Sequence, residues 1–462
     1  MSWFCCPFHT CERNRFGRAG KDERSVCCVM RSRLTDPGHR GLRRRRFLQL
    51  ALLAPLACRS SKPRSPNGRE RIRLGFKHQP LGSNPAPLRD LIAAYERNHP
   101  DIEVVTEALP NASDVAHQYF LTALEGGAEH FDVFVVDLIW TPEFARAGWI
   151  ADLSTAFPSE VIRRDFLPGL ADSAVIDGKT FAVPWYVDVG LLYYRRDLVP
   201  GAPRSYEELE QFTVQALRAN PHLQGYLWQG RQYEGLVCNV LEAIWGHGGS
   251  VWSDRRLRLE TPEGRAALGY LRLLLTKRIS PASVRSAAEE DSRRAFQNGG
   301  ALFMRNWPYA WGEVQRQDSA IRDKVGVTSL PTVGGEPGHG TLGGWHLALN
   351  ARSPDSNRPA AIQLIEHLTS AESNLSIALA YGRNPPRRAT YLDPGLAKAA
   401  PSIPTLLPIL QTARSRPATP YYNLVSDVLQ SEFSAAIAGI RAPEAALRNA
   451  QSQVDRITAQ GM

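Results

Sequence analysis

Three kinds of hydrophobic pattern follow one another after residue 70. Residues 71–76 alternate apolar and polar side chains, which predicts a strand with one buried face. Residues 87–98 carry apolar side chains at helical spacing. Residues 131–137 are almost continuously apolar, as in a parallel strand that is covered on both faces. Between them we expect a strand at 102–105 and a helix at 113–124, with Ser113 and Asp114 as N-cap candidates. The β-α-β-α-β order predicts an α/β fold.

The apolar stretch 181–196 is interrupted at Pro184. Because proline lacks a backbone N–H and restricts the preceding residue to extended geometry, we expect a break between two elements there. Trp185, Tyr186 and Asp188 surround the break. A carboxylate among such neighbours requires a partner if it is buried. The pattern therefore leaves two interpretations, a satisfied Asp188 or an edge strand whose Asp188 is solvated.

Asp137 ends the apolar strand at 131–137. In open parallel sheets, ligands bind beyond the carboxyl ends of the strands, so this carboxylate is a candidate for a binding site. The alternative is that Asp137 caps a helix that begins at Thr141.

Beyond residue 196 the pattern is mostly helical. Ser205 opens a sequence similar to a capping box, and Thr261 precedes Pro and Glu at a predicted helix start. Gly343 and Gly344 are adjacent, which lets the backbone come close to a ligand. Other expected elements are strands at 325–331 and 343–350 and helices at 356–369 and 371–381.

Composition narrows the class of protein. A chain of 462 residues with 43% hydrophobic residues is long enough for two or three domains. The net charge of +9 is concentrated in residues 1–57, which hold twelve basic and four acidic side chains. The remaining chain has a net charge of only +1 and no basic stripe with interleaved aromatics, so we expect no nucleic-acid binding.

The N-terminal region reads as an export signal. Arg44 and Arg45 precede a basic-then-apolar sequence that resembles a twin-arginine signal, and Cys58 follows Leu-Ala as in a lipobox. Residues 1–57 are therefore predicted to be a signal segment, with lipidation at Cys58. Pro55 departs from the usual lipobox, and a weakly basic cytosolic tail is the alternative.

Residues 1–29 do not fit a signal that begins the chain. They contain five cysteines, and Met30 would give an n-region of ordinary length, so this stretch is interpreted as a mis-assigned start. A zinc site built from these cysteines is the alternative. Residues 58–70 are rich in Pro, Ser and Gly and predict a flexible tether.

Five ordered blocks of the sequence resemble bacterial extracellular solute-binding proteins of family 1, specifically their trehalose- and maltose-binding branch. One block, for example, reads Pro-Trp-Tyr-x-Asp-x-Gly-Leu-Leu-Tyr-Tyr-Arg from Pro184, and another reads Phe-Met-x-x-Trp-Pro from Phe303. The full set of blocks is 132–149, 184–195, 303–311, 343–345 and 416–422.

The resemblance implies the two-lobe periplasmic-binding-protein fold, in which a hinge of crossing strands joins two α/β lobes around a ligand cleft. The crossings are expected near 184–188, 331–342 and 385–390. Lobe one then comprises 71–184 and 340–385, and lobe two comprises 188–331 and 388–462. Such proteins close over the ligand by hinge rotation.

The resemblance also implies a carbohydrate ligand and an ABC-transporter permease as partner. Aromatic faces pack on a sugar ring, and carboxylates, guanidinium groups and amides bond its hydroxyls. We expect a monomer on the outer side of the membrane, tethered by a lipid anchor, with no cofactor, metal or enzymatic activity. The candidate ligand-binding residues are Asp137, Tyr186, Asp188, Glu234, Trp307, Gly343, Gly344, Trp345 and Arg416.

Several alternatives remain at this stage. Glu234 also fits a solvated helix face, and Trp345 also fits a lobe core, since Leu347 and Leu349 alternate with it. The ligand of the same fold could instead be a glycerophosphodiester or a peptide, with Arg387 and Arg388 as further cleft cations. A secreted glycosidase would also place carboxylates beside aromatics. The loop 77–84 lacks a Glu that many family members have, which leaves the identity of the sugar open.

Overall fold

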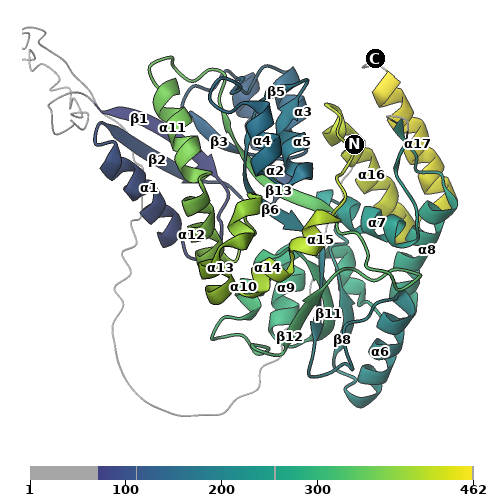
Figure 1. Cartoon of the computed structure of the whole chain (residues 1–462). Coiled ribbons are helices and arrows are strands. Elements are labelled where there is room, and N and C mark those ends of the chain that lie inside the picture. Colours follow the sequence, from purple (N-terminus) through teal and green to yellow (C-terminus); the bar gives the residue numbers. More distant parts are fainter. Residues whose placement is uncertain (1–70, 111, 254–255, 460–462) are drawn as a thin grey trace, which may run out of the picture. The chain divides into compact units, whose positions relative to one another are not determined.

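Two separate β-sheets organise the part of the chain that the computed structural model describes, which is residues 71–110, 112–253 and 256–459 (Figure 1). These residues belong to one compact unit. Within them, no helix combines the length and the apolar character needed to cross a bilayer. The predicted signal segment, Cys58 and the tether at 58–70 lie outside the described residues.

The first sheet has five strands, and its first three follow the predicted β-α-β-α-β order. β1 pairs in parallel with β2 and β3, whereas β13 runs antiparallel to both β3 and β6. Helices α1, α11 and α12 pack together, and α3 and α4 both pack against α5. The strand order is β2 (Ile102–Ala108), β1 (Ile72–His78), β3 (Val133–Asp137), β13 (Leu342–Leu349) and β6 (Val183–Val189). The helices are α1 (Ala86–Asn98), α2 (Ser113–Glu125), α3 (Thr141–Arg146), α4 (Ser159–Asp165), α5 (Pro168–Ala174), α11 (Arg358–Leu368) and α12 (Ala371–Tyr381).

The second sheet has four strands, and helices supply most of the surrounding structure. β7 runs antiparallel to β11 and β12, and β11 runs parallel to β8. Helices α7, α8, α16 and α17 pack on one another (Figure 1). The strand order is β12 (Val325–Thr328), β7 (Leu191–Arg195), β11 (Ala301–Asn306) and β8 (Gln224–Leu227). The helices are α6 (Tyr206–Ala219), α7 (Glu234–Gly246), α8 (Pro262–Thr276), α9 (Glu289–Gln297), α10 (Tyr309–Val314), α16 (Tyr422–Ile437) and α17 (Pro443–Ala459).

Short elements complete the described fold. They are β4 (Val175–Ile176), β5 (Lys179–Thr180), β9 (Trp252–Ser253), β10 (Arg256–Leu257), η1 (Ala282–Ser286), η2 (Arg388–Leu392), α13 (Pro394–Ala399), α14 (Ser402–Thr405) and α15 (Leu407–Gln411).

The structure confirms two of the predicted helix N-caps and contradicts a third. The side chains of Ser205 and Thr261 accept hydrogen bonds at the starts of α6 and α8, as predicted. Ser113, by contrast, is the first residue of α2 rather than its cap, and its hydroxyl donates to Asp137 instead. The competing carboxylate lies in a different strand, so the local pattern could not reveal it.

The expected break at Pro184 is wrong. β6 runs through this residue from Val183 to Val189, so Trp185, Tyr186 and Asp188 belong to the five-stranded sheet. Pro184 is tolerated because β6 ends the strand order and the register with β13 shifts beside it, and edge strands and bulges accommodate a missing N–H. The chain passes to the second sheet at Gly190, between β6 and β7.

The third crossing also differs from the prediction near 385–390. Leu167 N–H donates to Pro386, and Arg388 Nε donates to Phe166 O at 2.9 Å, which ties this segment to the elements beside the first sheet. Helix α13 packs against α12. The chain joins the second group of helices only at α16, after Arg414 has paired with Thr341. A proline-rich turn has the sequence expected of a segment that crosses between the two sheets. Only its packing shows which sheet it lies beside.

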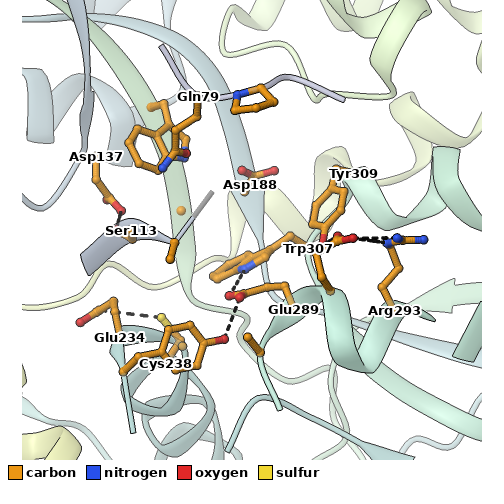
Figure 2. A pocket seen from close by; sticks show the side chains of 18 of the residues that line it. Gln79, Ser113, Asp137, Asp188, Glu234, Cys238, Glu289, Arg293, Trp307 and Tyr309 are labelled. Atoms are coloured by element: carbon orange, nitrogen blue, oxygen red, sulfur yellow. Dashed lines mark hydrogen bonds and ion pairs between the residues drawn. The ribbon is translucent and has the colours of Figure 1, made fainter. Parts of the chain in front are cut away.

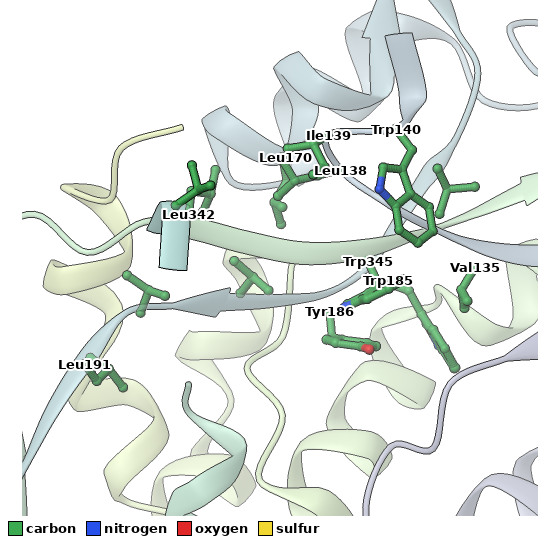
Figure 3. Close-up of a cluster of buried hydrophobic side chains, with 14 of the residues drawn as sticks. Val135, Leu138, Ile139, Trp140, Leu170, Trp185, Tyr186, Leu191, Leu342 and Trp345 are labelled. Atoms are coloured by element: carbon green, nitrogen blue, oxygen red, sulfur yellow. The ribbon is translucent and has the colours of Figure 1, made fainter. Parts of the chain in front are cut away.

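Aromatic side chains form much of the core of the first sheet. Figure 3 shows Trp140, Trp185, Tyr186 and Trp345 gathered around β13. Trp140 and Trp185 are almost completely buried. Trp345 is paired in the sheet register with Asp137, the last residue of β3, so this aromatic core adjoins the carboxyl end of that strand.

Candidate functional site

A cavity of about 720 Å³ is lined by strands of the first sheet and by helices and connecting segments that follow the strands of the second sheet. Its wall takes residues from the ends of β3, β6 and β13, from the starts of α7 and α9, and from the segment after β11. Figure 2 shows labelled residues of this wall. All nine ligand-binding candidates from the sequence line it: Asp137, Tyr186, Asp188, Glu234, Trp307, Gly343, Gly344, Trp345 and Arg416.

Arg416 joins a carboxylate of the first sheet to a carboxylate of helix α7. Its Nη2 lies 3.1 Å from Asp137 Oδ1, at the end of β3, and its Nη1 lies 2.9 Å from Glu234 Oε1, at the start of α7. The Arg416 side chain is only 3% exposed. Burial alone would lower the pKa of Arg416, but Asp137 and Glu234 raise it well above its ordinary value. The guanidinium therefore stays charged and forms ion pairs with both acids.

Further donors hold the same two carboxylates. Ser113 Oγ donates to Asp137 Oδ2 at 3.2 Å, and Tyr422 Oη donates to Glu234 Oε1 at 2.8 Å. Ser426 of α16 donates to the second oxygen of Glu234. The alternative of a solvated Glu234 is wrong, because the residue is 6% exposed. Asp137 does not cap α3, whose N-cap is Trp140 without a side-chain bond.

Asp188 has a looser environment on the same side of the cavity as Tyr186. Arg383 Nη1 reaches Asp188 Oδ2 at 3.4 Å, while Oδ1 is buried and has no hydrogen-bond partner among the described residues. The alternative of a solvated Asp188 is therefore wrong. Burial raises the pKa of this carboxyl, and Arg383 counteracts only part of that rise. A buried acceptor with a free oxygen is suited to a donor from a ligand.

Arg383 lies between two aromatic rings. Its Cζ is 4.8 Å from the Tyr186 ring centroid and 5.1 Å from that of Tyr309. Its Nε donates to Leu81 O at 3.0 Å. Tyr309 Oη donates to Glu290 at 2.8 Å, and Glu290 accepts from Arg293 at 2.7 Å. This chain of contacts orders the wall formed by α9 and α10 (Figure 2).

Trp307 presents an indole ring to the cavity. Its Nε1 donates to Glu289 at 3.2 Å, and the Arg305 guanidinium lies 3.9 Å from its ring centroid. A Cβ on Gly343 would come within 3.3 Å of both the Trp307 ring and the Asp188 side chain. Glycine at this position therefore lets the aromatic ring and the carboxylate lie close to the same stretch of backbone.

Trp345 serves the core and the cavity wall together. Only 8% of the residue is exposed, and its ring meets Trp140 edge-on with centroids 5.3 Å apart. The preceding Gly344 has a φ of 143°, which L side chains rarely adopt, and a Cβ there would lie 2.7 Å from Tyr186 O. Trp345 can therefore pack in the core and also present part of its ring to a ligand in the cavity.

The described residues match a family model over residues 80–375, and that model represents bacterial extracellular solute-binding proteins. A probable ABC transporter-binding protein of Deinococcus radiodurans is 34% identical over 368 residues, covering 76% of this chain and 86% of the relative. The chain belongs to the bacterial extracellular solute-binding proteins. The predicted resemblance to this family is confirmed.

Two further comparisons extend the family relationship. The maltose-bound structure of T. maritima MalE3 is 37% identical, with a TM-score of 0.79, and the match covers 84% of this chain and 100% of that one. A mannitol-binding protein of Pseudomonas aeruginosa is 24% identical, over 80% of this chain and 89% of the relative. The two-lobe fold is therefore confirmed, and the family consists of binding proteins rather than enzymes.

Sequence reasoning missed several residues of this solute-binding protein's cavity. Glu289, Glu290 and Arg293 lie at the start of α9, where consecutive acids read simply as a favourable first helical turn. Arg383 directly precedes Asn384 and lines the cavity, whereas the sequence pattern pointed to Arg387 and Arg388 as cleft cations. Those two arginines do not line the cavity: Arg387 contacts Asp165 at 3.3 Å and Arg388 donates to Phe166 O.

Proposed function

We propose that this solute-binding protein binds a di- or oligosaccharide of the maltose or trehalose type and delivers it to the permease of an ABC importer. The observation that carries the proposal is the buried, unpartnered Oδ1 of Asp188, whose side chain approaches the same glycine, Gly343, as the ring of Trp307. Such a pair suits a sugar, which has hydroxyl donors at its edge and an apolar face. The cavity of about 720 Å³ also lies in the range of small-molecule sites.

Each candidate residue has a role in this proposal. Trp307 and Trp345 stack on sugar rings, and Asp188 accepts a hydrogen bond from a sugar hydroxyl. The backbone amides of Gly343 and Gly344 supplement these contacts, and Tyr186 supports the site through Arg383. Asp137, Glu234 and Arg416 form a charged end of the cavity that meets ligand hydroxyls through oxygen atoms already ordered by their mutual bonds.

The charge balance of the wall argues against an anionic ligand. Seven carboxylates and five guanidinium groups line the cavity. Arg416 and Arg383 are both occupied by carboxylates, and so is Arg293. Of the other two, Arg294 lies 3.9 Å from Glu290 and Arg231 lies over the Tyr233 ring. A phosphodiester would therefore enter a partly buried wall that holds more carboxylates than guanidinium groups, and repulsion from the acids opposes its binding. These observations favour a neutral sugar over a glycerophosphodiester.

The proposed site of action is outside the cytoplasmic membrane. It rests on the family relationship and on the predicted signal segment with lipidation at Cys58, which lies outside the described residues. The twin-arginine route, the lipid anchor and the monomeric state stay predictions from the sequence.

A calorimetric titration of the purified protein tests the proposal. Maltose, trehalose, mannitol, glycerophosphocholine and a tripeptide are each titrated, and each sugar is recovered afterwards. We expect one molecule of a disaccharide to bind and to be recovered intact, with no binding of glycerophosphocholine. Arg387→Ala changes an arginine outside the cavity and serves as a control that retains binding. If glycerophosphocholine or the peptide bound more tightly than the sugars, that compound's class would be the ligand instead. Cleavage of a sugar would indicate a glycosidase.

A further inference from the structure

A buried ion pair lies next to the cavity but outside its lining. Arg305 of β11 is fully buried and donates from Nε to Glu242 Oε2 at 2.8 Å and from Nη2 to Glu242 Oε1. Glu242 belongs to α7 and is 6% exposed. Desolvation of two charges offsets much of their attraction, so a buried pair contributes little net stability compared with apolar packing. Its surroundings indicate a more specific role.

Glu242 also contacts both of the first two crossings between the sheets. Its Oε1 accepts from the backbone N–H of Thr341, directly before β13, at 2.9 Å. Gly190, between β6 and β7, donates its N–H to Thr341 O at 3.1 Å. A Cβ on Gly190 would lie only 2.0 Å from Glu242 Oε1. Glycine is therefore required for the first crossing to lie against this carboxylate.

Arg305 connects the same carboxylate to the cavity wall. Its Cζ lies 3.9 Å from the centroid of the Trp307 ring, within range of a cation–π contact. The edge of the ring is held by Glu289 through Nε1 at 3.2 Å. One face of the indole is thus covered by a guanidinium whose position depends on Glu242.

We infer that Glu242 and Arg305 are positioning residues, which hold Trp307 in a defined place relative to the crossings at Gly190 and Thr341. A change in crossing geometry must then be accompanied by a change at the ring, and a ligand on the ring must affect the crossings. The ligand half of this inference rests on the proposed sugar binding. The tie between ring and crossings is a property of the unliganded protein and can be tested without any ligand.

Hydrogen–deuterium exchange of the full chain without ligand tests the tie. In Glu242→Ala we expect faster exchange in the peptide containing Thr341, whose N–H loses its acceptor. We also expect faster exchange in the peptide containing Trp307, whose N–H donates to Asn306 at 2.8 Å. Asp197→Asn breaks the 2.7 Å pair with Arg195 in the same sheet and should leave both peptides unchanged. Unchanged exchange at Trp307 in Glu242→Ala would overturn the inference.

A second variant keeps the test decisive where Glu242→Ala does not fold. Glu242→Gln retains an oxygen acceptor for Thr341 but removes the charge that holds Arg305. Here the Thr341 peptide should remain protected, while the Trp307 peptide exchanges faster. Equal protection of both peptides at the wild-type level would contradict the positioning role.

Maltose is the probe for the second part of the inference, that a ligand on the Trp307 ring affects the crossings at Gly190 and Thr341. Arg305→Lys keeps a cation for Glu242 but removes the planar group from the Trp307 ring, and we expect about tenfold weaker maltose binding. In the wild type, saturating maltose should slow exchange at Thr341, and this protection should be lost in Arg305→Lys. Wild-type affinity and protection in the variant would overturn the inference. Absence of maltose binding to the wild type would instead count against the proposed function, and the ligand-free exchange would still decide the tie.

Discussion

Arg416 and Arg383 both line the cavity and both face carboxylates, but their environments differ. Arg416 contacts Asp137 at 3.1 Å and Glu234 at 2.9 Å, and its side chain is 3% exposed. Arg383 approaches Asp188 only to 3.4 Å, and the other oxygen of Asp188 has no partner among the described residues. Arginine and carboxylate therefore form a tight ion-paired bridge at Arg416, whereas at Arg383 one oxygen of Asp188 remains available as an acceptor.

The difference follows from what else holds each guanidinium. Arg416 is placed by two carboxylates, whereas Arg383 is placed by the rings of Tyr186 and Tyr309 and by the carbonyl of Leu81. Because aromatic rings and a carbonyl already fix Arg383, its bond to Asp188 can remain long. Arg416 thus mainly bridges β3 of the first sheet and helix α7, and the acceptor left for a ligand is on Asp188.

The largest expected effect comes from breaking the bridge. Arg416→Met leaves Asp137 and Glu234 as buried, uncompensated acids, so we expect a loss of about 3–5 kcal/mol in the free energy of unfolding. Denaturant or thermal unfolding measures it. Arg387→Met removes the partly exposed pair with Asp165 and should cost about 1 kcal/mol or less. Equal stability of the two variants would show that the Arg416 bridge does not hold the fold.

The two tryptophans of the cavity extend the comparison from charged to aromatic residues. Trp345 packs against Trp140 and is 8% exposed, so Trp345→Ala should destabilise the fold by about 3–5 kcal/mol. Trp307→Ala should chiefly weaken sugar binding, by roughly ten- to a hundredfold, which corresponds to about 1–3 kcal/mol. Melting temperature and affinity are measured for both variants. A large fall in melting temperature with unchanged affinity in folded Trp345→Ala would remove Trp345 from the binding site.

The smallest effect concerns the open acceptor. Burial raises the pKa of Asp188, so the folded protein binds this proton more tightly than the unfolded chain does. The stabilisation that Asp188 contributes is therefore fully present at a pH below the ordinary Asp pKa of about 3.9. It is lost as the pH rises through the higher pKa that Asp188 has in the folded protein. Asp188→Asn lacks this titration and should be more stable than the wild type at neutral pH, with the difference shrinking as pH falls.

The same substitution should weaken sugar binding about tenfold at neutral pH. A hydrogen bond to a charged acceptor contributes roughly 1.5–3 kcal/mol, and the amide oxygen of Asn retains part of it. Thermal unfolding between pH 4 and 8 and calorimetry at pH 7 measure the two effects. Asp137→Asn is the matched comparison at the closed bridge, where loss of an ion-paired charge should destabilise the protein instead. If both substitutions stabilised the protein, the environments of Asp188 and Asp137 would not differ in their effect on stability.

Local sequence determined much of the architecture. Alternating and helical patterns are properties of neighbouring residues, so they sufficed for β1, α1 and the rest of the first β-α-β-α-β unit, and for the caps at Ser205 and Thr261. Ordered sequence blocks sufficed for the family and for eight of the nine predicted residues that line the cavity, the exception being Glu234. The charge of residues 1–57 likewise marks that segment as different from the rest of the chain.

Only the tertiary structure decided which of these residues meet and which remain open. Arg416 and Asp137 are 279 positions apart, and no local pattern shows that one neutralises the other. Pro184 continues a strand because β6 lies at the end of the sheet, and Arg383 enters the cavity while Arg387 does not. In each case the deciding interaction is with a distant part of the chain, because burial and pairing depend on packing in three dimensions rather than on neighbours in sequence.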